Sequence, residues 1–141
     1  MLLSVTRIGG LAAAVTIACT VGAAGTADAA GQYYGAIALS RLKNAAIAVT
    51  DLPSRVSADA AAIRDCATYD CEIVLRFSDG CGAIAQGADG KWGWAAAGTR
   101  AEAEQFAVAS LGDSAPAFPD LGSATPRAAT VIAATCTRNA G

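Results

Sequence analysis

Short apolar runs, separated by glycine-containing or polar turns, dominate the chain from about residue 33 onward. Runs of β-branched and aliphatic residues at this length are typical of buried strands, and Ile73-Val74-Leu75 is a clear case. Asp89-Gly90 is a tight-turn pair between two such runs and indicates a hairpin. The pattern predicts strands at about 33–39, 45–49, 71–77, 82–85, 91–96 and 129–135.

Two alanine-rich segments place apolar residues at helical spacing. Ser54 is a typical N-cap for the first segment, and Thr99 with Glu102 predicts a capping box for the second. Small residues on the apolar faces predict that each helix lies close to the surface it covers. These faces consist of Ala58, Ala61, Ala62 and Cys66 in the first segment, and of Ala103, Phe106, Ala107 and Leu111 in the second.

The chain contains the same pattern twice. Tyr34-Gly-Ala-Ile-Ala38 recurs as Cys81-Gly-Ala-Ile-Ala85, the stretch 54–66 aligns with 99–111, and 72–81 has a counterpart that ends at Cys136. We therefore expect an α+β fold in which a strand-strand-helix-strand unit is duplicated. The units cover about 33–80 and 81–137 of a single domain, residues 30–141.

The second unit carries an additional loop at 112–128. Its prolines and glycines, at Gly112, Pro116, Pro119, Gly122 and Pro126, oppose regular structure. Such a loop is either functional or a tolerated insertion.

The N-terminal segment predicts export. Arg7 precedes an apolar run from Ile8 to about Ala24, and Ala27-Asp28-Ala29 is a small-x-small cleavage site, so residues 1–29 read as a signal peptide. A retained anchor and a lipidated Cys19 are the alternatives. No other long apolar run follows, so we expect no stable membrane span after cleavage and a secreted or cell-envelope location.

Charge excludes one class of partner. The chain has ten basic and twelve acidic residues, a net charge of −2, with no block of like charges. A nucleic-acid-binding protein needs a basic surface to neutralise phosphates, so we expect no nucleic-acid partner.

Four cysteines follow the predicted leader: Cys66, Cys71, Cys81 and Cys136. Their spacing does not fit a zinc ribbon, and an even number in an exported chain indicates disulfides. Of the three possible pairings, the duplication favours Cys66–Cys71. The second unit lacks a cysteine at both equivalent positions, and Leu111 stands at the position equivalent to Cys66. It also favours Cys81–Cys136, interpreted as the ends of equivalent strands that a pseudo-twofold axis brings together.

Few catalytic groups are available. The chain contains no histidine, which excludes Ser-His-Asp and Cys-His centres and histidine-bound metals, and it has no phosphate-binding glycine loop. We predict no metal and no cofactor. Asp51, Asp79 and Asp89 remain as an acid/base set, but aspartates in turns that bind their own backbone have the same pattern.

Aromatic residues are the alternative candidates for a site. Trp92 and Trp94 alternate and therefore share one face of a strand, and Tyr34 begins the corresponding repeat. On an exposed face the indoles form a platform for sugar rings or a partner, whereas on a buried face they are core.

The two Gly-Ala-Ile-Ala motifs, Trp92-Gly-Trp94 and the Ala-Glu-Ala of the second helix resemble the small exported bacterial family known as domain of unknown function 4189, common in actinobacteria. The resemblance covers about Tyr34 to Cys136 and implies no established activity. The chain departs from the family pattern in lacking a cysteine near Leu111 and in its proline-rich loop. By analogy, the duplicated unit suggests a double-psi-like β-barrel with two short helices.

These features favour a non-enzymatic exported module that binds a glycan or an envelope component, with Trp92, Trp94 and Tyr34 as candidate binding residues. The alternative is a carbohydrate-directed hydrolase or lyase that uses aspartates. A purely structural envelope protein is the third interpretation.

Overall fold

The computed structural model describes residues 31–112 and 128–140. The predicted signal peptide, 1–29, and nearly all of the predicted loop, 112–128, lie outside the described residues. The elements follow the order β1 (Tyr34–Ser40), β2 (Ala45–Leu52), α1 (Arg55–Cys66), β3 (Glu72–Ser78), β4 (Cys81–Gln86), β5 (Trp92–Ala97), α2 (Arg100–Ala109) and β6 (Thr130–Cys136). Every predicted strand and both predicted helices are present, with shifts of a few residues at the ends.

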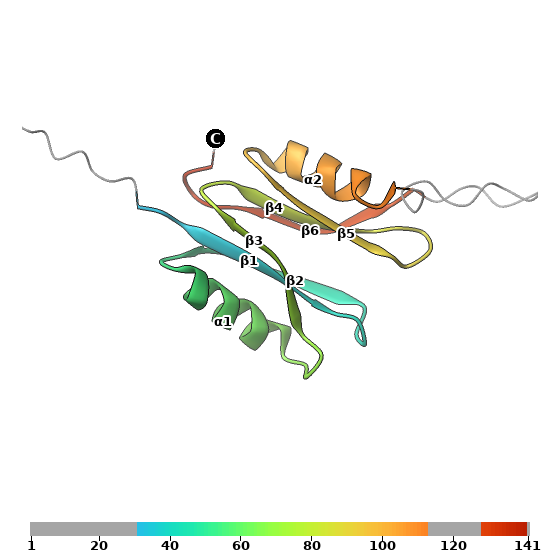
Figure 1. The fold of residues 1–141 in the computed structure, drawn as a ribbon, viewed down its shortest axis with the longest axis horizontal. Helices are drawn as coiled ribbons and strands as arrows, with labels where there is room; N and C mark the ends of the chain where they lie inside the picture. The colour runs from blue at the N-terminus through green and yellow to red at the C-terminus, as the bar shows by residue number, and fades with distance from the viewer. Residues whose placement is uncertain (1–30, 113–127, 141) are drawn as a thin grey trace, which may run out of the picture.

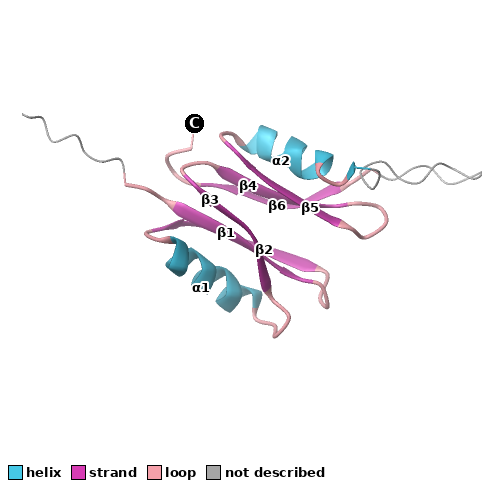
Figure 2. Ribbon diagram, in the orientation of Figure 1, coloured by secondary structure: helices cyan, strands magenta, loops and turns pink. Residues whose placement is uncertain are grey.

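The strands form two antiparallel sheets of three strands each, in the orders β2-β1-β3 and β5-β4-β6. The sheets lie face to face, with α1 covering the outer face of the first and α2 the outer face of the second (Figures 1 and 2). The fold is therefore α+β, in four layers. A double-psi-like barrel is not seen among the described strands, because the central strand of each unit pairs with the two other strands of its own unit.

Alternating residues of the central strands contribute to different cores. In β1, Ala36 and Ala38 pack beneath α1, whereas Ile37 and Leu39 face the second sheet. In β4 the alanines pack beneath α2, and Ile84 joins the core between the sheets. The alanines on the helix side of each sheet allow the helix to lie close to it, as the small residues of the helices predicted. The larger side chains fill the space between the two sheets.

Both units place a glycine directly against one phenylalanine. Gly35 of β1 and Gly82 of β4 lie beside the ring of Phe77, where a β-carbon at either position would come within 2.5 Å of a ring carbon. Phe77 is buried, and it is the register partner of Gly35 across the β1–β3 pair. The glycine in each Gly-Ala-Ile-Ala motif therefore makes room for the central ring.

Two disulfides join Cys66 to Cys71 and Cys81 to Cys136, the two pairs that the sequence favoured. The second pair arises from a different geometry than the one predicted. Cys81 begins β4 and Cys136 ends β6, so the two are opposite residues on adjacent strands and not equivalent ends related by symmetry. The corresponding register pair in the first unit is Tyr34 and Ser78.

The helix starts differ in detail from the expectation. Ser54 and Ser57 form a reciprocal capping box at α1. At α2 the hydroxyl of Thr99 accepts a bond from the Glu102 N–H and donates one to the Glu102 carboxylate. The carboxylate therefore bonds the Thr99 side chain instead of the Thr99 backbone N–H that a capping box requires.

Phe106, predicted on the buried face of the second helix, is 53% exposed, because α2 contacts its sheet through its alanines.

Candidate functional site

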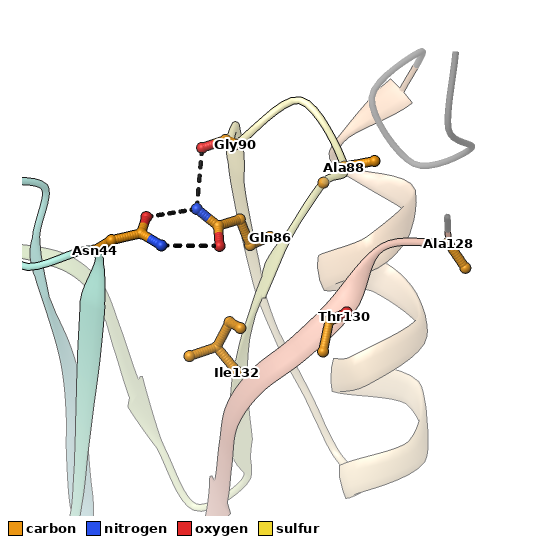
Figure 3. A pocket seen from close by; sticks show the side chains of 8 residues that line it. Asn44, Gln86, Ala88, Gly90, Ala128, Thr130 and Ile132 are labelled. Carbon is orange, nitrogen blue, oxygen red and sulfur yellow. Dashed lines mark hydrogen bonds between the residues drawn. The ribbon is translucent and has the colours of Figure 1, made fainter. Parts of the chain in front are cut away.

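A cavity of about 460 Å³ lies at one end of the sandwich. It is formed where the β1–β2 turn, the β4–β5 turn and the start of β6 come together (Figure 3). The described residues that line it are Asn44, Gln86, Gly87, Ala88, Gly90, Ala128, Thr130 and Ile132. Its volume is within the range of about 300–1,000 Å³ typical of small-molecule sites.

Two side-chain amides connect the units at this cavity. Asn44 Nδ2 donates to Gln86 Oε1 at 3.3 Å, and Gln86 Nε2 donates to Asn44 Oδ1 at 2.6 Å (Figure 3). Gln86 Nε2 also donates to the carbonyl oxygen of Gly90 at 3.3 Å. The two amides therefore hold each other in fixed orientations at the mouth between the two turns.

Local turn chemistry positions both amides. Asn44 has a φ of 50°, a left-handed conformation that asparagine tolerates better than most residues. In the β4–β5 turn, Gly87 N–H donates to Lys91 O at 2.8 Å and Gly90 N–H donates to Gly87 O at 2.9 Å. Gly90 has a φ of 80°, which fits the predicted hairpin. Gln86 is therefore the last residue of β4 before a tightly closed turn.

The lining combines neutral polar groups with a small apolar surface. None of the described lining residues carries a formal charge. Amide and hydroxyl groups provide donors and acceptors, whereas Ile132, Ala88 and Ala128 provide apolar contact. This combination is suited to an uncharged molecule that has hydroxyl groups and an apolar face.

The three candidate aspartates lie outside this lining, and each accepts hydrogen bonds from other protein groups. Asp79 Oδ1 accepts bonds from Asn139 Nδ2 at 2.7 Å and from Tyr33 N–H at 3.0 Å. The Asn139 amide first, and then the Tyr33 N–H, lower the pKa of Asp79. A catalytic acid at neutral pH needs the opposite shift.

Asp51 and Asp89 have similar structural surroundings. Asp51 Oδ1 accepts a bond from Arg138 N–H at 2.8 Å, and the Arg138 side chain lies 3.5 Å from the same oxygen. Asp89 Oδ1 accepts a bond from Lys91 N–H at 3.1 Å, within the β4–β5 turn. The Asp89 contact matches the interpretation of an aspartate that bonds its own turn. Asp51 instead lies in β2, and Asp51 and Asp79 both accept bonds from residues far away in the sequence.

The structure does not bring the three candidate aromatic residues together. Trp92 and Trp94 are half-buried and pack against the cluster of Ile37, Leu39, Phe77 and Ile84 between the sheets. Tyr34 packs on the other side of its sheet, beneath α1, with the Arg55 guanidinium 6.0 Å from its ring centre. The two indoles therefore contribute to the core.

The sequence analysis missed Asn44 and Gln86. Both are ordinary polar residues at strand ends, and a single sequence gives no signal that two turns from different units meet. The predicted repeat did not indicate that the two sheets face each other.

The described part of the chain was also compared with the requirements of a metal site and of a membrane-spanning helix. Residues 31–112 and 128–140 contain no cluster of three or more histidine, cysteine, aspartate or glutamate side chains placed to hold a metal ion. Over the same ranges, neither helix has the length and apolar character needed to cross a membrane.

A protein-family model described as "Domain of unknown function (DUF4189)" matches residues 34–136. No curated protein and no solved structure matches the chain.

Proposed function

This chain belongs to the family described as domain of unknown function (DUF4189), and from that premise we propose that it is an exported, non-enzymatic binding module. Its ligand occupies the cavity between the β1–β2 and β4–β5 turns. The observation that carries the proposal is the pair of mutually bonded amides, Asn44 and Gln86, among described lining residues that carry no formal charge. A neutral, hydroxyl-rich ligand such as an uncharged glycan of the cell envelope fits this chemistry.

The location of the site supports binding over catalysis. The cavity offers hydrogen-bonding groups from three separate elements, as binding sites do. The candidate carboxylates, in contrast, accept bonds from backbone N–H groups outside the cavity lining. The ligand is therefore held and released without a bond being broken.

Export is supported by the two disulfides, because such bonds persist in oxidising compartments. The predicted leader at 1–29 provides the route. We place the protein outside the cytoplasmic membrane, either secreted or held at the envelope through its ligand.

Duplication is the proposed origin of the cavity. The two units have the same order of elements, and in each sheet the first strand of the unit is central. A strand of sequence Gly-Ala-Ile-Ala occupies the centre of both sheets. The β1–β2 and β4–β5 turns are then the same turn in two copies, each contributing one amide to the site.

A screen of uncharged and charged glycans, followed by envelope extracts, tests the proposal. Gln86→Met removes the amide at nearly constant volume, and Gln105→Met makes the same change at an exposed position of α2. We expect a neutral glycan to bind the natural protein and the Gln105→Met variant, and to bind Gln86→Met about tenfold more weakly, as the loss of one or two hydrogen bonds predicts. Equal binding by all three proteins, or selection of charged glycans only, contradicts the proposed site.

A further inference from the structure

The loop between α1 and β3, residues 67–71, is closed into a small ring by the Cys66–Cys71 disulfide. Within the ring, Cys71 N–H donates to Thr68 O at 3.3 Å, and the Thr68 hydroxyl lies 2.9 Å from Cys71 Sγ. Ala67, which ends α1, has a left-handed φ of 55°. The disulfide thus fixes a turn that carries Asp70 immediately before Cys71.

Asp70 connects this loop to the β1–β2 turn. Its Oδ1 accepts a bond from the Ser40 hydroxyl at 2.8 Å, and its Oδ2 accepts one from Leu42 N–H at 2.8 Å. The Ser40 oxygen in turn accepts a bond from Lys43 N–H at 3.1 Å. Ser40 is only 1% exposed, so its polar group depends on these protein partners. The Leu42 N–H, the largest cause, also lowers the pKa of Asp70.

The β1–β2 turn ends at the ligand cavity. Asn44 N–H donates to Arg41 O at 3.3 Å, which closes the turn and gives Asn44 its left-handed backbone. Its side chain then reaches Gln86 in the second unit. A continuous set of bonds therefore runs from the disulfide through Asp70 and the turn to the amide pair.

We infer that Asp70 positions Asn44 for ligand binding, and that the Cys66–Cys71 disulfide makes this positioning depend on redox state. The inference rests on the proposed function for its ligand, but the coupling itself is a property of the free protein. Asp70 is a positioning residue, because it lies outside the lining of the cavity and acts through the turn that it holds.

The redox step is an ordinary thiol–disulfide exchange with a dithiol. One thiolate of the dithiol attacks Sγ of Cys71, a mixed disulfide forms, and Cys66 leaves as a thiolate that takes up a proton. The second thiol of the dithiol then displaces Cys71. The protein disulfide gains two electrons and two protons, and the dithiol becomes a disulfide.

The two bridges differ in their surroundings. Cys66 is 8% exposed and Cys71 is half-buried beside a loop in which Tyr69 is 93% exposed. Cys81 is 1% exposed, and it lies opposite the half-buried Cys136 on paired strands. Because Cys71 lies in the loop before β3, we expect a dithiol to reach its Sγ without separating paired strands. We therefore expect limiting dithiothreitol to reduce Cys66–Cys71 first, as peptide mapping after alkylation can establish.

The test follows the side-chain amide signals of Asn44 and Gln86 by nuclear magnetic resonance in the ligand-free protein. We expect both pairs of signals to move, and their exchange with solvent to rise at least about fivefold, on selective reduction and in Asp70→Asn, which can no longer accept both bonds. Asp65→Asn is the matched control, because Asp65 adjoins Cys66 but bonds only to the neighbouring Arg64. Its amide signals should match those of the natural protein.

Unchanged Asn44 and Gln86 signals in both the reduced protein and Asp70→Asn overturn the inference. If reduction unfolds the domain, Asp70→Asn with its disulfides intact decides the result alone. Ligand titrations distinguish the two proposals. A ligand that binds equally before and after reduction supports the proposed function and contradicts the coupling between the Cys66–Cys71 disulfide and the binding site. Amide signals that respond to reduction, in a protein that binds no glycan, preserve the coupling and remove the proposed ligand.

Discussion

Gly82 lies against the ring of Phe77, so closely that a side chain at this position would force the ring to shift. A β-carbon added to Gly82 would come within 2.5 Å of Phe77 Cε1, and Phe77 comes from the other sheet. This contact joins the two units at the centre of the molecule.

Replacing Gly82 with alanine should therefore destabilise the domain by about 1–3 kcal/mol, the usual cost of overpacking a core. Denaturant unfolding of Gly82→Ala measures it. Gly98→Ala is the control, because the nearest atom to an added β-carbon there is Glu102 Oε2 at 4.0 Å. Phe77→Leu should restore part of the stability of Gly82→Ala; equal stability of the two alanine variants would contradict the central contact.

The two disulfides should contribute unequally to stability. Cys81 and Cys136 are 55 residues apart, whereas Cys66 and Cys71 are only five apart. Loop entropy therefore predicts a stabilisation of about 4 kcal/mol by Cys81–Cys136 and of about 2 kcal/mol by Cys66–Cys71. Paired alanine substitutions of each bridge, compared by guanidinium unfolding, measure the difference. A larger loss on removal of Cys66–Cys71 would refute this order.

Acid should weaken the contacts of Asp79 with Tyr33 and Asn139. The folded-state pKa of Asp79 is lowered by Asn139 and Tyr33, so its stabilising effect is complete above the ordinary aspartate value of about 3.9 and disappears as the pH falls through the lower folded value. Melting temperatures between pH 5 and pH 2 should therefore fall less steeply for Asp79→Asn and Asn139→Ala. Asparagine tolerates the φ of 49° at residue 79, so the turn is retained. Profiles parallel to that of the natural protein would argue against this contribution.

The indoles should behave as core residues. Trp94 is half-buried against the cluster between the sheets, so Trp94→Ala should reduce the free energy of unfolding by roughly 2–3 kcal/mol, less than the 3–5 kcal/mol of a fully buried aromatic. Thermal unfolding and tryptophan fluorescence measure it. Full stability combined with lost glycan binding would instead support the aromatic platform.

Helices and strands could be predicted from local pattern, and the disulfide pairs from the repeat that the sequence predicts. Ser54 and Thr99 indicate the helix starts, and the apolar runs indicate the strands. The pairing of Cys81 with Cys136 followed from the repeat, although the physical cause is direct register between β4 and β6.

The sandwich could not be predicted in the same way. In β1 and β4 almost every residue is buried, so their continuous apolar sequence does not indicate which face meets a helix and which meets the other sheet. The candidate site shares this difficulty, because Asn44 and Gln86 lie 42 residues apart and meet only when the sheets face each other.

Chemical-shift mapping of the isotopically labelled protein during titration with the best neutral glycan tests the central claim most directly. The account predicts that the largest shifts fall on Asn44, Gln86, Gly87 and Thr130, and that they vanish in Gln86→Met while Gln105→Met retains them. Shifts centred on Asp51, Asp79 or the exposed face of α1, with the Asn44 and Gln86 signals unchanged, would contradict it.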